Sequence, residues 1–241
     1  MGRLKKLLQL AGRPGSWAAL GKTRTAAAVE HLPLLQWVRP DTLIDVGANK
    51  GQFTLAAQLA VPNVKVIAFE PLPSEAAMFR RNFDGDTRVR LLPLALAATQ
   101  GRVTLHVTDR PDSSSLLALG SAAREAYGLK PQQAIEVEQQ RLDAVISAED
   151  LVGTSLLKID VQGAEAMVID GAAGLLPSID FVYVELSFVP LYANQPLAGD
   201  IIAQLTKAGF VLRGVQNLSA TRAFGPTQAD FLFENARRGR G

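Results

Sequence analysis

Apolar and polar positions along residues 41–235 fall into short blocks that switch between the periods of strands and helices. Short apolar runs predict buried strands, and apolar residues three and four positions apart predict helices between them. The predicted strands are Thr42–Val46, Val64–Phe69, Val89–Leu92 (running on to Leu96), Ser155–Ile159, Phe181–Leu186, Phe210–Val215 and Ala229–Phe233. The predicted helices are Gln52–Leu59, Glu75–Phe83, Gly163–Ile169 and Leu197–Ala208. This alternation predicts an α/β domain with a Rossmann-like, doubly wound and mostly parallel sheet.

Two regions depart from the alternation. Residues 216–228 contain Gly225 and Pro226 and show no helical period, so a loop is expected to join the last two strands. Strands joined without a crossover helix are antiparallel, which predicts one antiparallel strand at the C-terminal end of the sheet. Between residues 101 and 146, alternating apolar residues predict an inserted hairpin, in which residues 103–107 pair with 135–137 and overhang the site as a lid.

The chain divides into three parts. Residues 1–40 predict an N-terminal helical appendage, with a second helix over residues 25–38. Leucines at helical spacing within residues 3–11 favour packing across the domain, and leave open a weak membrane-surface contact through their basic neighbours. Residues 41–235 form the α/β domain. Residues 236–241 are rich in Arg and Gly and predict a basic, disordered tail.

Composition narrows the class of protein. The net charge is only +2, and no basic stripe is interleaved with aromatic residues, so no nucleic-acid partner is expected. The chain has no cysteine, which excludes disulfides, thiolate nucleophiles and zinc–thiolate sites. No apolar run has the roughly 18 residues of a membrane span, and the N-terminus makes a poor signal peptide. The predicted location is cytoplasmic.

Two glycines, Gly47 and Gly51, follow the first predicted strand where a helix is about to begin. A glycine has no Cβ, so the backbone there can turn sharply and approach a ligand closely. Glu70 ends the second predicted strand, 19 residues after Gly51 (70 − 51 = 19), close to the spacing at which an acid binds ribose hydroxyls. An ordinary strand–turn–helix explains the glycines alone, but Glu70 adds the second half of a site for an adenosine-type cofactor.

The identity of that cofactor depends on Asn49, which stands where a dinucleotide site has its second glycine. That glycine lets a pyrophosphate touch the backbone, so a side chain there disfavours NAD. S-adenosylmethionine carries adenosine without phosphate and is the predicted cofactor. Asp45 is expected to meet the cofactor's amino group, or to hold the turn by accepting backbone N–H groups. The predicted cofactor-binding residues are Asp45, Gly47, Asn49, Gly51, Phe53, Glu70 and Pro71.

Several motifs together resemble the FkbM-type methyltransferase family over roughly residues 41–234. They are Asp45-Val46-Gly47-Ala48-Asn49-x-Gly51-Gln52-Phe53, Phe69-Glu70-Pro71, Ser114-Ser115-Leu116, Arg141-Leu142-Asp143, Leu157-Lys158-Ile159-Asp160-Val161-Gln162-Gly163-Ala164-Glu165, Glu185-Leu186-Ser187-Phe188, Leu191-Tyr192 and Ala229-Asp230-x-Leu232-Phe233. The family usually has Glu where this chain has Gln162, so no role of that Glu is carried over. The resemblance implies methyl transfer to a hydroxyl oxygen, often on a sugar or a polyketide.

Three carboxylates are the candidate catalytic residues. Asp160 ends the fourth predicted strand beside Gly47, where we expect it to act as general base or orienting group. A purely structural role, or contact with the cofactor, is the alternative. Glu165 follows at a helix start, where a carboxylate is also stabilised without any catalytic role. Glu185 ends the next strand, and with Tyr192 it is a candidate acceptor contact, although the tyrosine fits simple packing equally well.

Neither the histidines nor a metal site adds a candidate. The histidines, His31 and His106, fit surface positions better than catalytic ones. No compact set of oxygen ligands indicates a metal ion.

The site residues therefore predict an S-adenosylmethionine-dependent enzyme, and the resemblance implies an O-methyltransferase whose acceptor is the hydroxyl of a small molecule, such as a secondary metabolite, or of a sugar or glycan. Two alternatives stay open. One is a non-catalytic methyltransferase-like assembly partner, and the other is an NAD-linked oxidoreductase.

Overall fold

The computed structural model describes residues 25–238, and residues 1–24 and 239–241 lie outside its described part. The amphipathic segment over residues 3–11, with its expected membrane-surface contact, therefore falls outside the described residues. Only residues 25–40 of the predicted appendage are described.

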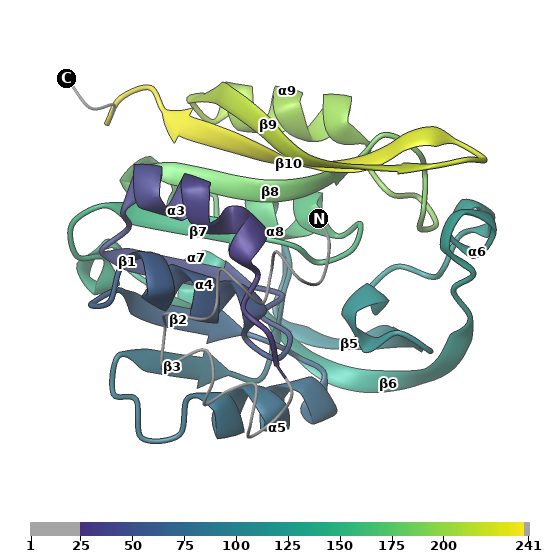
Figure 1. Ribbon diagram of the computed structural model, residues 1–241, viewed down its shortest axis with the longest axis horizontal. Coiled ribbons are helices and arrows are strands. Elements are labelled where there is room, and N and C mark those ends of the chain that lie inside the picture. The colour runs from purple at the N-terminus through teal and green to yellow at the C-terminus, as the bar shows by residue number, and fades with distance from the viewer. Residues whose placement is uncertain (1–24, 239–241) are drawn as a thin grey trace.

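A seven-stranded sheet forms the centre of the domain, as Figure 1 shows. Its strands are β1 (Thr42–Val46), β2 (Lys65–Phe69), β3 (Val89–Leu92), β7 (Ser155–Ile159), β8 (Phe181–Ser187), β9 (Phe210–Thr221) and β10 (Gly225–Asn235). Their order in the sheet is β3-β2-β1-β7-β8-β10-β9. β1 is parallel to β2 and β7, and every residue of β1 and β7 is buried, because helices cover both faces. The Rossmann-like fold is confirmed.

The reversed strand is β10, which pairs antiparallel with β8 on one side and β9 on the other. The antiparallel C-terminal strand is thus confirmed, and it lies inside the sheet rather than at its edge. The loop expected over residues 216–228 is wrong, because β9 continues to Thr221 and β10 already begins at Gly225. Its polar residues hid the strands, since this part of β9 is largely exposed. The register between β9 and β10 shifts on either side of Gln228. This irregularity accommodates Pro226, which has no N–H to donate to the neighbouring strand.

Helices pack on both faces of the sheet (Figure 1). One face carries α3 (Leu32–Val38), α4 (Gln52–Ala60) and α5 (Pro73–Asn82), and the other carries α7 (Leu142–Val145), α8 (Glu165–Gly171) and α9 (Ala198–Lys207). Each helix set buries its apolar side chains against the sheet in a separate core cluster. The two clusters hold the carboxyl ends of the parallel strands in fixed relative positions.

The helix expected over residues 25–38 begins later than its pattern suggested. The short 3-10 helix η1 (Val29–His31) leads into α3, with Pro33 in the first turn, where its missing N–H costs nothing. Residues 25–28 are not helical, and the N–H of Ala28 instead donates to the carbonyl of Gln52 at 3.0 Å. That bond ties the segment before η1 to the start of α4, next to the glycine turn.

The insertion after β3 is a second, three-stranded sheet in the order β4-β6-β5. It comprises β4 (Ala95–Leu96), β5 (Gly101–Thr108) and β6 (Pro131–Gln140), together with α6 (Ser121–Tyr127) and η2 (Pro111–Ser113). The predicted hairpin is confirmed, since Val103 lies opposite Val137 and Leu105 opposite Ile135. Two more 3-10 helices, η3 (Ala148–Asp150) and η4 (Leu176–Ser178), complete the described elements.

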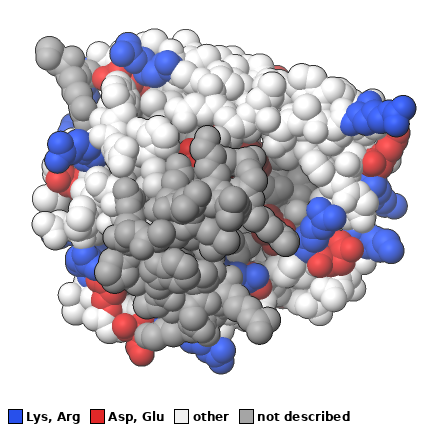
Figure 2. Space-filling model, viewed as in Figure 1, with Lys and Arg blue, Asp and Glu red and all other residues white. Residues whose placement is uncertain are grey.

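The surface and the C-terminal end add three observations. On the face shown in Figure 2, basic and acidic side chains alternate around the rim.

Ala236–Arg238 are the described part of the tail that was expected to be disordered. They form a turn in which Arg238 pairs with Asp180 at 2.7 Å. Within residues 25–238, no helix combines the length and apolarity that crossing a membrane requires.

Candidate active site

The turn after β1 lies against the end of β7, at the point where the order of the strands in the sheet reverses. Gly47 has a positive φ of 72°, and a Cβ there would collide with the carbonyl oxygen of Asp160. The N–H of Asp160 donates to the carbonyl of Val46 at 3.1 Å. Asp160 therefore lies beside Gly47 at the switch point, where ligands of such sheets bind.

Gly51 stands between the turn and α4. It caps the N-terminus of α4 with φ at 89°, and a Cβ there would strike the ring of Phe83 and crowd Phe79. It lines neither of the two cavities described below. The packing of α4 against Phe83 by itself favours a glycine at this position.

Glu70 lies at the end of β2 with only 7% of its surface exposed. Its Oε2 accepts the N–H of Asn49 and its Oε1 accepts the N–H of Leu72, both at 2.8 Å. Burial raises the pKa of Glu70 to about 7, against the opposing effect of these two hydrogen bonds. Each carboxylate oxygen keeps a further lone pair, so the group can accept two more hydrogen bonds from a ligand.

A cavity with apolar walls opens beside Glu70. It is lined by Pro71 and by leucines that include Leu96, Leu105 and Leu116, all three from the insertion. A second and larger cavity of about 570 Å³ lies on the other side of the turn, towards β8 and β10. Both cavities share Gly47, Asn49 and Asp160 as wall residues. One ligand can thus occupy the apolar cavity and present its end to a second ligand across Gly47.

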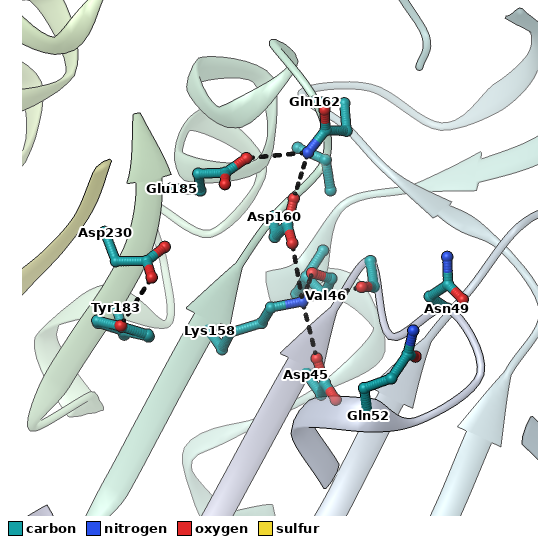
Figure 3. A network of polar contacts seen from close by, with 12 residues as sticks. Asp45, Val46, Asn49, Gln52, Lys158, Asp160, Gln162, Tyr183, Glu185 and Asp230 are labelled. Carbon is teal, nitrogen blue, oxygen red and sulfur yellow. Dashed lines mark hydrogen bonds and ion pairs between the residues drawn. The ribbon is translucent and has the colours of Figure 1, made fainter. Parts of the chain in front are cut away.

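A buried lysine, to which the sequence motif gave no role, organises the floor of the site. Lys158 Nζ lies 3.2 Å from Oδ1 of Asp45 and 3.8 Å from Oδ2 of Asp160, and it donates to the carbonyl of Gly47 at 2.9 Å (Figure 3). Burial lowers the pKa of Lys158, but the two carboxylates outweigh burial and raise it above 10.5. The lysine is therefore charged and fixes the turn from below.

Asp45 is fully buried beneath the turn. Its Oδ2 accepts the hydroxyl of Thr54 at 2.7 Å, and its Oδ1 faces Lys158. It lines neither cavity and bonds side chains rather than the N–H groups of the turn. Its position favours holding Lys158 over meeting a cofactor amino group.

Gln162 joins two of the candidate catalytic carboxylates. Its Nε2 donates to Oδ1 of Asp160 at 2.7 Å and to Oε2 of Glu185 at 3.0 Å (Figure 3). Its Oε1 accepts the hydroxyl of Tyr192 at 3.1 Å. Asp160 and Glu185 both line the larger cavity, so the structure brings these two predicted residues together. Tyr192 lines neither cavity but braces Gln162 from behind, in keeping with a packing role.

Glu165, the third candidate, points elsewhere. Its Oε1 accepts the N–H of Gly163 at 2.9 Å and that of Val161 at 3.3 Å, and the side chain is 4% exposed. Burial raises the pKa of Glu165 to about 7. It lines neither cavity, so its geometry favours holding the loop between β7 and α8 over contact with a substrate.

The far wall of the larger cavity contains a cluster that the sequence analysis did not bring together, although it predicted Phe53 as a cofactor contact and quoted Asp230 in a family motif. His31 Nδ1 lies 3.0 Å from the hydroxyl of Tyr183, and that hydroxyl donates to Oδ2 of Asp230 at 3.0 Å. Asn217 donates to the same oxygen of Asp230 at 2.8 Å. The His31 ring packs against Phe53, with ring centroids 5.1 Å apart. These residues come from η1, α4, β8, β9 and β10, so no local motif joins them.

The Methyltransferase FkbM domain family matches residues 45–212 of the chain. The chain belongs to the FkbM methyltransferase family. The 2-O-methyltransferase NoeI of Sinorhizobium fredii is 31% identical to it over 189 residues, which cover 74% of this chain and 78% of NoeI. The 31-O-demethyl-FK506 methyltransferase FkbM of Streptomyces tacrolimicus is 28% identical over 203 residues, covering 75% and 76%. The hexuronic acid methyltransferase AglP of Haloferax volcanii is 25% identical over 147 residues, covering 61% and 56%.

Membership of the FkbM methyltransferase family identifies the cofactor as S-adenosylmethionine and sets aside the NAD-linked alternative. The residues present fit this cofactor. Glu70 has free lone pairs for ribose hydroxyls, the apolar cavity beside it suits an adenine ring, and the shared wall at Gly47 leads to the larger cavity. Within residues 25–238 no three His, Asp or Glu side chains are arranged to hold a metal ion.

The FkbM methyltransferase fold explains why some residues were found and others missed. Glu70 and Asp160 each follow the end of a parallel strand, and this position alone predicts that both side chains lie at the same edge of the sheet. Lys158 carried a signal that was not used, because a lysine flanked by Leu157 and Ile159 in a buried strand needs a buried partner. His31 carried no such signal.

Proposed function

We propose that this protein transfers a methyl group from S-adenosylmethionine to a hydroxyl oxygen of a sugar, a glycan or a related hydroxyl-bearing metabolite. The observation that carries the proposal is the pair Asp160 and Glu185, which Gln162 holds side by side in the wall of the larger cavity. Carboxylates accept hydrogen bonds and suit a ligand that carries many hydroxyl donors. The names of NoeI and AglP, which describe a 2-O-methyltransferase and a hexuronic acid methyltransferase, support an acceptor of this class.

Each side of the site has a distinct task in this proposal. S-adenosylmethionine supplies an electrophilic methyl group and a neutral leaving group. Glu70 binds the ribose, and Lys158 holds the glycine turn at its fixed distance from Asp160. Asp160 and Glu185 bind acceptor hydroxyls and orient one of them towards the methyl group. Much of the rate then comes from alignment of the two reacting groups.

Calorimetry with S-adenosylmethionine, and separately with NAD, tests the first half of the proposal. We expect binding of S-adenosylmethionine alone. The second half is tested with methyl-tritiated cofactor and a panel of neutral methyl glycosides. The product should keep its label in dilute alkali, because a methyl ether resists alkaline hydrolysis whereas a methyl ester does not.

Asp160→Asn provides the matched variant, because it removes the charge but keeps the shape of a residue in the shared wall. Cofactor binding should be retained, and the rate of methyl transfer should fall by at least about 10²-fold, as expected for loss of a group that orients the acceptor. An equally active variant would remove Asp160 from the site. A folded protein that binds neither cofactor would instead favour the non-catalytic assembly partner.

A further inference from the structure

The imidazole of His31 is held rigidly at the wall of the larger cavity. Its ring lies against Phe53, and its edge meets the ring of Tyr183 at a centroid distance of 5.6 Å and an angle of 82°. The Phe53 ring in turn lies 5.8 Å from Nζ of Lys158, beneath the glycine turn. The side chain of His31 is 16% exposed and lines the cavity. The ring therefore faces the space next to the cofactor side of the site.

The hydrogen bonds of His31 define which nitrogen carries the proton. The hydroxyl of Tyr183 has one hydrogen, and it donates this hydrogen to Asp230. Nδ1 of His31 has two neighbours, the tyrosine oxygen at 3.0 Å and Nδ2 of Asn217 at 3.3 Å. The shorter contact requires Nδ1 to donate to the tyrosine oxygen, so we assign the proton to Nδ1 and the lone pair to Nε2. Among residues 25–238, Nε2 has no hydrogen-bond partner.

We propose that His31 is the general base that accepts the proton of the acceptor hydroxyl, and that Asp230 positions it through Tyr183. This inference rests on the proposed hydroxyl methylation. In the step, the acceptor oxygen forms a bond to the methyl carbon while the carbon–sulfur bond breaks, and its electron pair goes to sulfur. The hydroxyl proton passes to Nε2 of His31, which becomes an imidazolium facing Asp230 and later releases the proton to solvent.

The carboxylates across the cavity are less suited to this task. Asp160 has both oxygens engaged, one by the amide of Gln162 and the other by Lys158. Oε2 of Glu185 already accepts from Gln162 at 3.0 Å and from Gln228 at 2.8 Å. These groups are held as acceptors that fix a substrate in place, and Oε1 of Glu185 is left for a substrate hydroxyl. His31 faces the same cavity with a neutral nitrogen base.

The charges around His31 suit a base that works at neutral pH. Burial lowers the pKa of His31 below its usual 6.5, so the free imidazole is neutral. The charged groups that face it are Asp230 on β10, Glu30 on η1, Lys158 on β7 and Asp160 after β7. The carboxylates among them raise the pKa and Lys158 lowers it, and burial has the largest effect. The pKa of Asp230 is raised by burial.

A histidine titration by NMR tests the assignment without turnover. The chain has only two histidines, and His106→Gln leaves the His31 signal alone in the spectrum. His106 lies on β5 and lines neither cavity, so it serves as the matched control. We expect His31 to titrate below 6.5, and lower still in Asp230→Asn, because that change removes a charge that raises its pKa. Titration at or above 6.5, or no shift in Asp230→Asn, would overturn the assignment.

Turnover supplies the second readout. His31→Gln should lower kcat by about 10²- to 10⁴-fold, the usual contribution of a general base, with the cofactor Kd unchanged. His31→Gln should also lose the acidic limb of the pH profile of kcat/KM. His106→Gln should keep the wild-type kcat and the acidic limb. A wild type that forms no methyl ether would overturn the proposed function, and with it the role of His31 in the reaction. An active wild type with an equally active His31→Gln would overturn the role of His31 alone.

Discussion

The pKa of Glu70 makes cofactor affinity depend on pH. Its carboxyl group titrates at about 7 in the free protein, because burial disfavours the charge. S-adenosylmethionine is expected to bind the ionised form, since the ribose hydroxyls donate to carboxylate oxygens and a protonated oxygen no longer accepts as well. The affinity for S-adenosylmethionine should therefore be highest well above pH 7 and should fall progressively as the pH falls through 7.

The size of this effect follows from the titration. If only the ionised form binds, lowering the pH from 8 to 6 weakens the apparent affinity about tenfold, or about 1.4 kcal/mol. Glu70→Gln removes a charge-assisted hydrogen bond worth about 1.5–3 kcal/mol, which corresponds to a loss of roughly 10- to 150-fold at pH 8. The amide also faces one backbone N–H, of Asn49 or Leu72, with a donor instead of an acceptor.

Calorimetry at pH 6, 7 and 8, in two buffers of different ionisation enthalpy, measures the affinity and the protons released. We expect about half a proton to be released at pH 7, because half of the Glu70 carboxyl groups are then protonated. The matched control is Glu165→Gln, since Glu165 also titrates at about 7 but lines neither cavity. The pH dependence should survive in Glu165→Gln and vanish in Glu70→Gln. If Glu70→Gln bound as tightly as the wild type, Glu70 would not be the ribose acid.

Three further changes test the frame of the site. Glu165→Gln should keep methyl transfer and should raise Tm more at pH 8 than at pH 4. The pKa of Glu165 rises on folding, so its carboxyl group stabilises the folded state below the unfolded-state pKa near 4.5. This contribution is lost as the pH rises through 7, where the wild type must bury a charge that the amide does not carry. Thermal melts at the two pH values measure this, and lost turnover would give Glu165 a catalytic role. Lys158→Met should cost about 3–5 kcal/mol in denaturant unfolding, because it leaves Asp45 as a buried charge without its cation. Adding Asp45→Asn should restore part of that loss, and full stability in the single variant would contradict the ion pair. Gly51→Ala should cost about 1–3 kcal/mol through overpacking, and a second change, Phe83→Leu, should relieve it; two additive losses would refute the contact.

The sequence located the residues around the glycine turn far better than those on the far wall of the larger cavity. Glu70 and Asp160 follow from the rule that the ends of parallel strands meet at one edge of a sheet. The contact between Gly51 and Phe83 was not predicted, because it is made between residues far apart in sequence. His31 reaches the site only because the segment before η1 docks on α4, and no periodicity encodes that docking.

The C-terminal hairpin shows the same limit in the fold. The polar stretch over residues 216–228 matched a loop because its strands lack the apolar alternation of a half-buried sheet. Pairing between β9 and β10 stabilises it instead, and such pairing leaves little trace in a single sequence. Asn217 lies in that stretch, so an error in the fold also concealed a residue of the site.

The matched family region, residues 45–212, divides the site along the sequence. Glu70, Asp160 and Glu185 lie within it, whereas His31, Asn217 and Asp230 lie in the flanking segments. The first flank contributes η1, and the second contributes β10 and the end of β9 to the sheet itself. Substitution of these three side chains would change the wall of the larger cavity and leave the apolar cavity beside Glu70 untouched. One domain can in this way keep a single methyl donor while its acceptor evolves independently.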